Sequence, residues 1–81
     1  MKLTIISPES EETLDVAWVE VNTHAGNFIV LQDHAPLVAT LKLNETVTIC
    51  LENGKQENIQ PEGGIIEVHR KQVKLLLTKA P

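Results

Sequence analysis

Three histidines and one cysteine are the side chains of this 81-residue chain best suited to bind a metal ion or to act in catalysis. His24, His34, His69 and Cys50 fall on separate segments, with no His-x-x-x-His, Cys-x-x-Cys or His-Glu-x-x-His spacing among them. Such spacings hold ligands or bases together on one element. We therefore predict no catalytic residue, metal ligand or cofactor. A small metal-dependent enzyme built on the three histidines is kept as an alternative.

A second chemical alternative depends on Lys55, which directly follows Asn53-Gly54. Lipoyl and biotinyl carrier domains present one lysine at the tip of a hairpin, where the cofactor is attached covalently. Here Asn53 and Gly54 occupy the expected tip, and Lys55 begins the next strand. An exposed lysine beside a turn is common, so a carrier modified at Lys55 is the less favoured reading.

The two adjacent glycines, Gly63 and Gly64, do not predict a phosphate-binding loop. They lead into the apolar run Ile-Ile-Glu-Val, which is typical of a strand. A phosphate cradle needs the free backbone N–H groups of a helix N-terminus. A bulge or a tight turn is the better interpretation.

Composition predicts one small cytoplasmic domain, residues 1–81. The formal net charge is −4, which disfavours nucleic acid or an anionic membrane as a direct partner. A single cysteine fits a reducing compartment, and no run of about twenty apolar residues is present to span a membrane. Met1-Lys2 leads into a strand rather than a signal peptide. The acidic run 9–12, with Asp15, is expected to form a solvated loop that could face a basic surface.

Alternation of apolar and polar residues predicts an all-β fold. In the segment 46–52, Val47, Ile49 and Leu51 fall on one face. The segments 3–6 and 72–77 repeat the pattern, with Leu76 as an exception. Asn53-Gly54 predicts a type I′ hairpin that joins 46–52 to 55–60. We expect a two-layer β-sandwich or flattened barrel of about eight to ten short, mainly antiparallel strands.

The segment 14–21 is apolar on both of its predicted faces. One face carries Leu14, Val16 and Trp18, and the other carries Ala17, Val19 and Val21. Such a strand lies at the centre of a sandwich or is covered by another chain. Burial within the domain is the favoured interpretation. In the other case Trp18 is the expected interface anchor, because aromatic side chains dominate binding energy.

The order of five short elements resembles the N-terminal β-sandwich of the epsilon subunit of rotary F-type ATP synthases. These elements are Leu3–Glu9 (LTIISPE), Gly26 before an apolar strand, His34-Ala35-Pro36-Leu37, Gly63-Gly64 before Ile-Ile-Glu-Val, and the apolar last strand Gln72–Leu77. No element is specific alone, but together they cover nearly the whole chain in the family order.

The resemblance implies a non-catalytic rotor subunit of the central stalk, which couples proton flow to ATP synthesis. It implies contacts with the c-ring at His24, Gly26 and Asn27. Contacts with the gamma subunit are implied at Ser7, His34, Ala35, Pro36 and Leu37. The expected location is the cytoplasmic face of the bacterial inner membrane, reached only through the complex. No cofactor is expected.

The sequence departs from the family pattern at three places within the chain and at its end. Ile29 replaces a frequent glycine, and Gln32-Asp33 replaces the Pro-Gly that often precedes the histidine. Leu43-Asn44-Glu45 stands where another Pro-Gly is usual. Full-length relatives continue into a two-helix hairpin that can inhibit ATP hydrolysis, whereas this sequence stops at Thr78-Lys79-Ala80-Pro81. A natural short form and a piece of a longer chain are both open.

Overall fold

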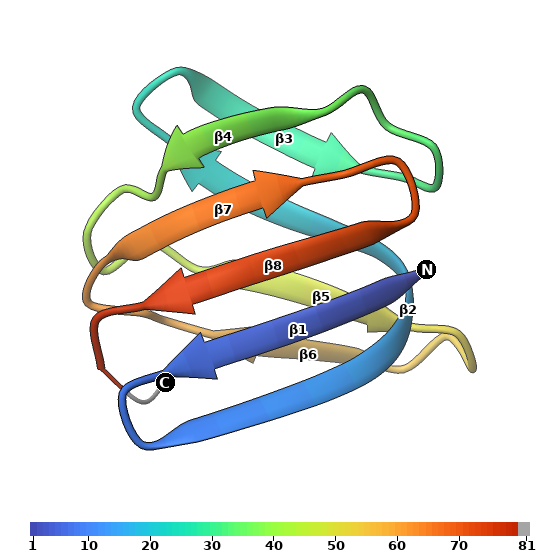
Figure 1. Ribbon diagram of the computed structural model, residues 1–81, viewed down its shortest axis with the longest axis horizontal. Helices are drawn as coiled ribbons and strands as arrows, with labels where there is room; N and C mark the ends of the chain where they lie inside the picture. The colour runs from blue at the N-terminus through green and yellow to red at the C-terminus, as the bar shows by residue number, and fades with distance from the viewer. Residues whose placement is uncertain (80–81) are drawn as a thin grey trace.

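The computed structural model describes residues 1–79 and has eight strands and, within those residues, no helix (Figure 1). The strands are β1 (Lys2–Ser7), β2 (Ser10–Thr23), β3 (Gly26–Val30), β4 (Leu37–Thr40), β5 (Val47–Leu51), β6 (Gln56–Ile59), β7 (Gly64–Val68) and β8 (Gln72–Leu77). The predicted all-β class is confirmed. Within the described range, therefore, nothing helical is long and apolar enough to cross a membrane.

β2 belongs to both layers of the fold. Its first half pairs with β1, and its second half pairs with β3 and β5. We call β4-β7-β8-β1 and the first half of β2 the front sheet. The back sheet is β3, the second half of β2, β5 and β6. Figure 1 shows the front sheet nearest the viewer. All pairs are antiparallel except β1 with β8, which run parallel.

The core between the two sheets is built almost wholly from Val, Ile and Leu. Its buried side chains come from both layers: Leu3, Ile5, Val16, Val19, Val21, Val30, Leu41, Val47, Ile49, Ile66, Val68, Val73, Leu75 and Leu77. Phe28 packs against this cluster from its margin. The predicted inward faces of β1, β5 and β8 are confirmed, because alternate residues of a strand point to opposite sides.

The predicted faces of the segment 14–21 are wrong, because a bulge interrupts β2. Val16 pairs with Leu51, and Trp18 pairs with Cys50, so two steps along β2 match one step along β5. A bulge shifts the alternation by one residue. Val16 therefore shares the buried face with Val19 and Val21, while Ala17 is exposed and Trp18 is only partly buried.

The acidic run also differs from its expected place in a loop. Glu11 and Glu12 lie in β2, opposite Ile6 and Ile5 of β1. This first half of β2 is the edge of the front sheet, and exposed charges on an edge strand discourage pairing with another chain. Glu11 and Glu12 point to opposite sides of that edge, because they are adjacent residues of one strand.

The hairpin between β5 and β6 forms where it was predicted, but its turn type was predicted wrongly. Gly54 has a φ of 91°, whereas Asn53 is absent from the residues with positive φ. A type I′ turn needs positive φ at both positions. The Gly54 N–H donates to the Leu51 carbonyl at 2.9 Å. This pattern matches a type I turn over Glu52-Asn53, followed by a bulge at Gly54.

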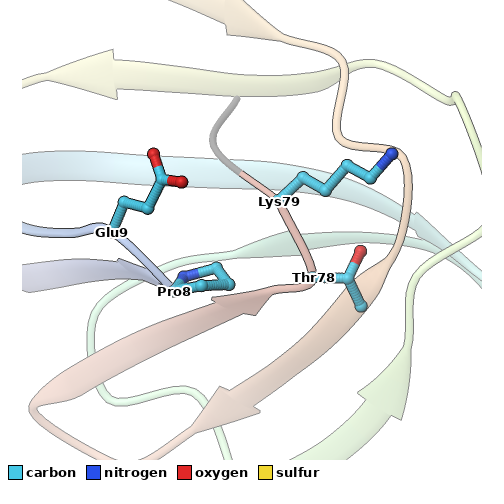
Figure 2. A pocket seen from close by; sticks show the side chains of 4 residues that line it. All are labelled: Pro8, Glu9, Thr78 and Lys79. Atoms are coloured by element: carbon cyan, nitrogen blue, oxygen red, sulfur yellow. The ribbon is translucent and has the colours of Figure 1, made fainter.

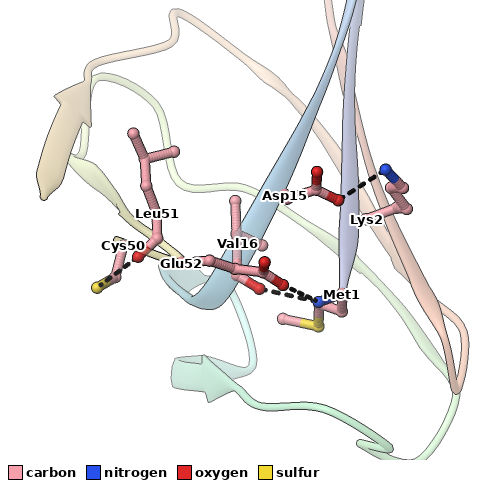
Figure 3. A network of polar contacts seen from close by, with 7 residues as sticks. All are labelled: Met1, Lys2, Asp15, Val16, Cys50, Leu51 and Glu52. Atoms are coloured by element: carbon pink, nitrogen blue, oxygen red, sulfur yellow. Dashed lines mark hydrogen bonds and ion pairs between the residues drawn. The ribbon is translucent and has the colours of Figure 1, made fainter. Parts of the chain in front are cut away.

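A polar network ties the start of the chain to the bend of β2 (Figure 3). The α-amine of Met1 donates to the Val16 carbonyl at 2.9 Å and lies 3.5 Å from Glu52 Oε1. The Val16 N–H donates in turn to the Met1 carbonyl at 2.9 Å. The backbone groups of Val16 are thereby paired at the point where β2 passes from one sheet to the other, as buried polar groups must be.

Gly64 allows β7 to approach β8 more closely than a side chain would permit. A Cβ at Gly64 would lie 2.5 Å from the Leu76 carbonyl oxygen, whereas one at Gly63 would meet side-chain atoms at 3.4 Å. We predict that Gly64→Ala lowers the free energy of unfolding by about 2 to 3 kcal/mol. Gly63→Ala is the matched control and should cost less than about 1 kcal/mol, because flexible side chains can move aside. Urea denaturation measures both; equal losses would contradict the close approach.

The turn geometry leads to a second pair of substitutions. Gly54→Val forces a β-branched residue to a φ of 91°, and we predict a loss of about 1 to 3 kcal/mol in the free energy of unfolding. Asn53→Val places the same side chain at the preceding residue, where φ is negative, and should lower the free energy of unfolding by less than about 1 kcal/mol. A type I′ turn would instead make both variants costly, so thermal or urea unfolding of the pair separates the two turn types.

Candidate partner-binding surface

The residues predicted to contact the c-ring lie together at one end of the sandwich. His24 and Ala25 form the turn between β2 and β3, and Gly26 and Asn27 begin β3, all exposed. Thr23 is fully buried. Its hydroxyl donates to the Gly26 carbonyl at 2.9 Å and accepts from the Ala25 N–H at 3.1 Å. This fixed, exposed turn is suited to contact with another protein.

The histidine corner lies at the opposite end, in the loop that crosses from β3 to β4 (Figure 1). His34 Nδ1 donates to the Ala35 carbonyl at 2.7 Å, so the ring serves local backbone structure. Ala35 and Pro36 are exposed. Leu37 is partly buried and packs against the core. Of the four corner residues, Leu37 is therefore the one whose side chain stabilises the fold by packing against the core.

Ser7 lies far from the histidine corner. It is buried, and its hydroxyl is 2.8 Å from that of Ser10. Leu37 is level with Leu3 through the pairs across β7 and β8. Ser7 is four residues beyond Leu3, so strand rise and strand spacing put Ser7 and Leu37 roughly 20 Å apart. The predicted gamma contacts thus mark two diagonal corners of the front sheet.

Between those corners, a row of apolar side chains crosses the outer face of the front sheet. The paired residues of this row are Thr40, Ile65, Leu76, Ile6 and Glu11, one from each strand in order from β4 to β2. Ile65 is 41% exposed, and Val38, in the neighbouring row, is 70% exposed. Thr40 and Glu11 end this row at β4 and β2, and we call the three apolar side chains between them, Ile65, Leu76 and Ile6, the apolar row.

The sequence analysis did not identify the apolar row, although one signal was present. Ile6 and Leu76 occupy positions where strict alternation calls for polar residues. Only the parallel pairing of β1 with β8 puts these two exceptions side by side. Pairing of β7 with β8 then adds Ile65. Adjacent apolar residues on the outer face of a sheet indicate a surface that another chain can cover.

Trp18 lies on the other outer face of the molecule, that of the back sheet. It pairs with Cys50, which is buried although it points away from the core. Ile29, 52% exposed, lies on the same face, opposite Glu20. Trp18 and the apolar row therefore cannot contact one flat partner surface. Trp18 lies opposite Cys50 and is only partly buried, and Ala17 is exposed, so the favoured interpretation, a strand buried on both faces within the domain, is wrong for this outer face.

The structure gives no support to the two chemical alternatives. His24, His34 and His69 lie in separate connections, and residues 1–79 contain no group of three or more His, Cys, Asp or Glu side chains placed to hold a metal ion. Lys55 lies beyond the hairpin tip, where its N–H donates to Asn53 Oδ1 at 2.9 Å. Metal analysis and the intact mass of natively expressed protein test these alternatives directly.

A shallow, open pocket of about 420 Å³ lies beyond the ends of β1 and β8, beside Ser7 (Figure 2). Its lining residues are Pro8, Glu9, Thr78 and Lys79. Lys79 Nζ is paired with Glu62 Oε2 at 2.9 Å. The lining has the composition of ordinary surface, with no group of side chains suited to catalysis.

Comparison with known proteins identifies what this arrangement is similar to. Residues 1–80 match the family model described as ATP synthase, Delta/Epsilon chain, beta-sandwich domain. Two ATP synthase epsilon chains from strains of Clostridium kluyveri are each 34% identical to this chain over 80 residues. The match covers 94% of this chain and 58% of each relative. The chain thus spans somewhat more than half the length of these curated relatives.

Two solved structures have the same fold. A chain of the Euglena gracilis mitochondrial ATP synthase (OSCP/F1/c-ring, rotational state 1) gives a TM-score of 0.85 at 24% identity, covering 98% of this chain and 51% of that one. A chain of the Tetrahymena thermophila mitochondrial ATP synthase central stalk and c-ring gives 0.79 at 14% identity, covering 98% and 63%. At these identities the likeness concerns the fold alone.

An exposed ion pair lies on the same outer face as the apolar row, separated from it by the Thr4–Thr13 pair, and gives a titration prediction. Lys2 Nζ lies 2.7 Å from Asp15 Oδ1. The hydrogen bond and charge of Lys2 hold the pKa of Asp15 below its ordinary value of 3.8. We predict that Lys2→Met raises the Asp15 pKa toward 3.8, as measured by NMR titration of the carboxyl carbon. Lys74→Met is the control and should leave this pKa unchanged.

The sign of the linked stability effect follows from the direction of the shift. A carboxyl group with a lowered pKa in the folded state contributes stability above its ordinary pKa. That contribution is lost as the pH falls through the lowered value. Because both side chains are exposed, the contribution is small and screened by salt. An unchanged Asp15 pKa in Lys2→Met would contradict the pairing.

Proposed function

We propose a function from one premise: this chain belongs to the ATP synthase delta/epsilon chain β-sandwich domain family. The function is that of a central-stalk rotor subunit, which docks on the gamma subunit and the c-ring and couples proton flow to ATP synthesis. The role is mechanical, with no catalytic residue and no cofactor. We also propose that residues 1–81 act as one domain of this type.

The observation that carries the gamma-binding part of this proposal is the apolar row. A rotor subunit must transmit torque through an interface that does not slip, which calls for apolar anchors within a polar surround. Ile65, Leu76 and Ile6 supply such anchors across three strands, and Val38 extends them toward the histidine corner. The row passes beside Ser7, and the line that contains it ends at Thr40, three residues along β4 from Leu37 of the histidine corner.

The c-ring part of the proposal is supported by the turn between β2 and β3. His24, Gly26 and Asn27 are exposed at the end of the sandwich where β1, β4 and β8 also end (Figure 1). The side chain of Asn27 is held by hydrogen bonds to Glu20 and Asn22 at 3.2 and 3.0 Å. A pre-organised polar turn loses little conformational entropy on binding. Membrane association then occurs through the complex, on the cytoplasmic face.

Trp18 receives a smaller role in this proposal than its residue type suggested. Its face is opposite to the apolar row, and it is partly buried across from Cys50 of β5. As an interface anchor it would serve a partner on the back sheet.

The experiment is co-purification with the gamma subunit and c-ring from the same source, followed by affinity measurement on gamma. We predict that Val38→Asp weakens gamma binding by about tenfold or more, because it buries an unpaired charge in the contact. Val38 is a better choice than Leu37, since Leu37 is partly buried against the core and a charged residue there would also destabilise the fold. Lys55→Glu, at the far hairpin, is the control and should change binding less than about twofold.

Two results would count against the proposal. Failure of the wild-type chain to bind gamma would remove its main support. Equal losses in Val38→Asp and Lys55→Glu would place the gamma contact elsewhere on the domain. Thermal unfolding of both variants separates lost binding from lost folding.

A further inference from the structure

We propose that the front sheet binds one amphipathic helix of its partner, which crosses the strands along the apolar row and presents Lys or Arg side chains to Glu11 and Glu9. This inference depends on the proposed docking to gamma and adds the chemistry and orientation of that contact. Three observations carry it: the spacing of the apolar row, the polarity of the row beside it, and the unpaired acidic groups at one end.

The spacing of the apolar row matches the turns of a helix. Neighbouring strands are about 4.8 Å apart, and one helical turn rises about 5.4 Å. A helix lying across the strands therefore puts about one turn over each of Ile65, Leu76 and Ile6. The whole row from Thr40 to Glu11 spans four strand spacings, roughly 19 Å, which is the length of about 13 helical residues.

The width of the apolar surface also favours a helix over a third sheet. The next row on the same face contains Glu67, Lys74 and Thr4 beside Val38. A covering sheet would bury these polar groups together with the apolar row, at a cost unless each found a partner. A helix about 10 Å wide, with an apolar stripe along one side, covers the apolar row and leaves Glu67 and Lys74 at its margin.

The charges at the β2 end define the orientation of the partner. Glu11 ends the row on the edge strand, next to Ile6, and Glu9 lies in the turn just before this strand. Both are exposed, and neither takes part in any ion pair among residues 1–79. At the other end the row finishes in uncharged Thr40. Complementary charge therefore places the partner's cations over β2, where they set orientation and association rate.

The test is the dissociation constant of the full chain for gamma from the same source, at about 50 mM and 500 mM salt. Glu11→Lys should weaken binding by about tenfold at low salt and by less at high salt, because screening removes the repulsion. Glu57→Lys makes the same change in net charge on β6 of the back sheet, and its dissociation constant should stay within about twofold of the wild-type value. Glu12→Lys is a stricter control, because Glu12 is the next residue and points to the other side of the edge strand. This variant should lose less binding affinity than Glu11→Lys.

The apolar part is tested by a pair of equal substitutions. Ile65→Thr and Ile29→Thr replace similarly exposed isoleucines on opposite outer faces. Ile65→Thr should weaken binding about tenfold, and Ile29→Thr less than about twofold. Both variants should remain folded, as checked by thermal unfolding, because neither side chain belongs to the core.

Helical geometry is tested by photo-crosslinkers placed at Thr40 and at Thr13, the two margins of the outer face. Crosslinked partner residues identified by mass spectrometry should lie on one segment, about 10 to 14 residues apart. Capture of two unrelated segments would overturn the single helix. Equal effects of Glu11→Lys and Glu57→Lys would overturn the charge orientation while leaving gamma docking intact. A wild-type chain that does not bind gamma would overturn the proposed function, and this inference with it.

Discussion

The fourteen residues of β2 pair with β1 along the first half and with β3 and β5 along the second, so one continuous strand joins the two layers of the sandwich. The bulge between Val16 and Trp18 makes this possible, since it bends the strand and returns the next apolar residues to the core side. The Met1 backbone pairs with both polar groups of Val16 at the bend. Loss of that bend would turn Val19 and Val21 outward and separate the layers.

The front sheet depends on a second constraint, the parallel pairing of β1 with β8. This pair joins the start of the described chain to its end, so residues about seventy positions apart in the sequence become neighbours. It completes the inner layer of Leu3, Val73 and Leu75, and it also creates the apolar row outside. The same pairing that buries the core therefore exposes a surface fitted to a partner, because alternate residues of a strand cannot all point inward.

The two outer faces of the sandwich differ in what they offer to other chains. On the back sheet, Trp18 lies opposite the buried Cys50, and the surrounding positions are mostly polar. On the front sheet, apolar side chains continue across three strands. At one edge lie the carboxylates of Glu9 and Glu11, which form no ion pair among residues 1–79, and the Lys2–Asp15 pair lies on the same face. A rigid domain with one partner-binding face and a fixed polar turn at one end suits a mechanical role under the proposed function. Nothing in such a role requires the histidines or Lys55 to act chemically.

Alternation within short segments determined the all-β class, the positions of most strands and the inward faces of β1, β5 and β8, because strand periodicity is a local property of the chain. The order of the motifs also determined the family. The bulge in β2, the turn type at Gly54 and the strand position of Glu11 and Glu12 were decided by pairing between distant segments, which no local pattern contains. For the same reason the sequence pattern singled out Leu76 alone as an exception to alternation and did not single out Ile6. Their union into one surface with Ile65 exists only once β7, β8 and β1 lie side by side.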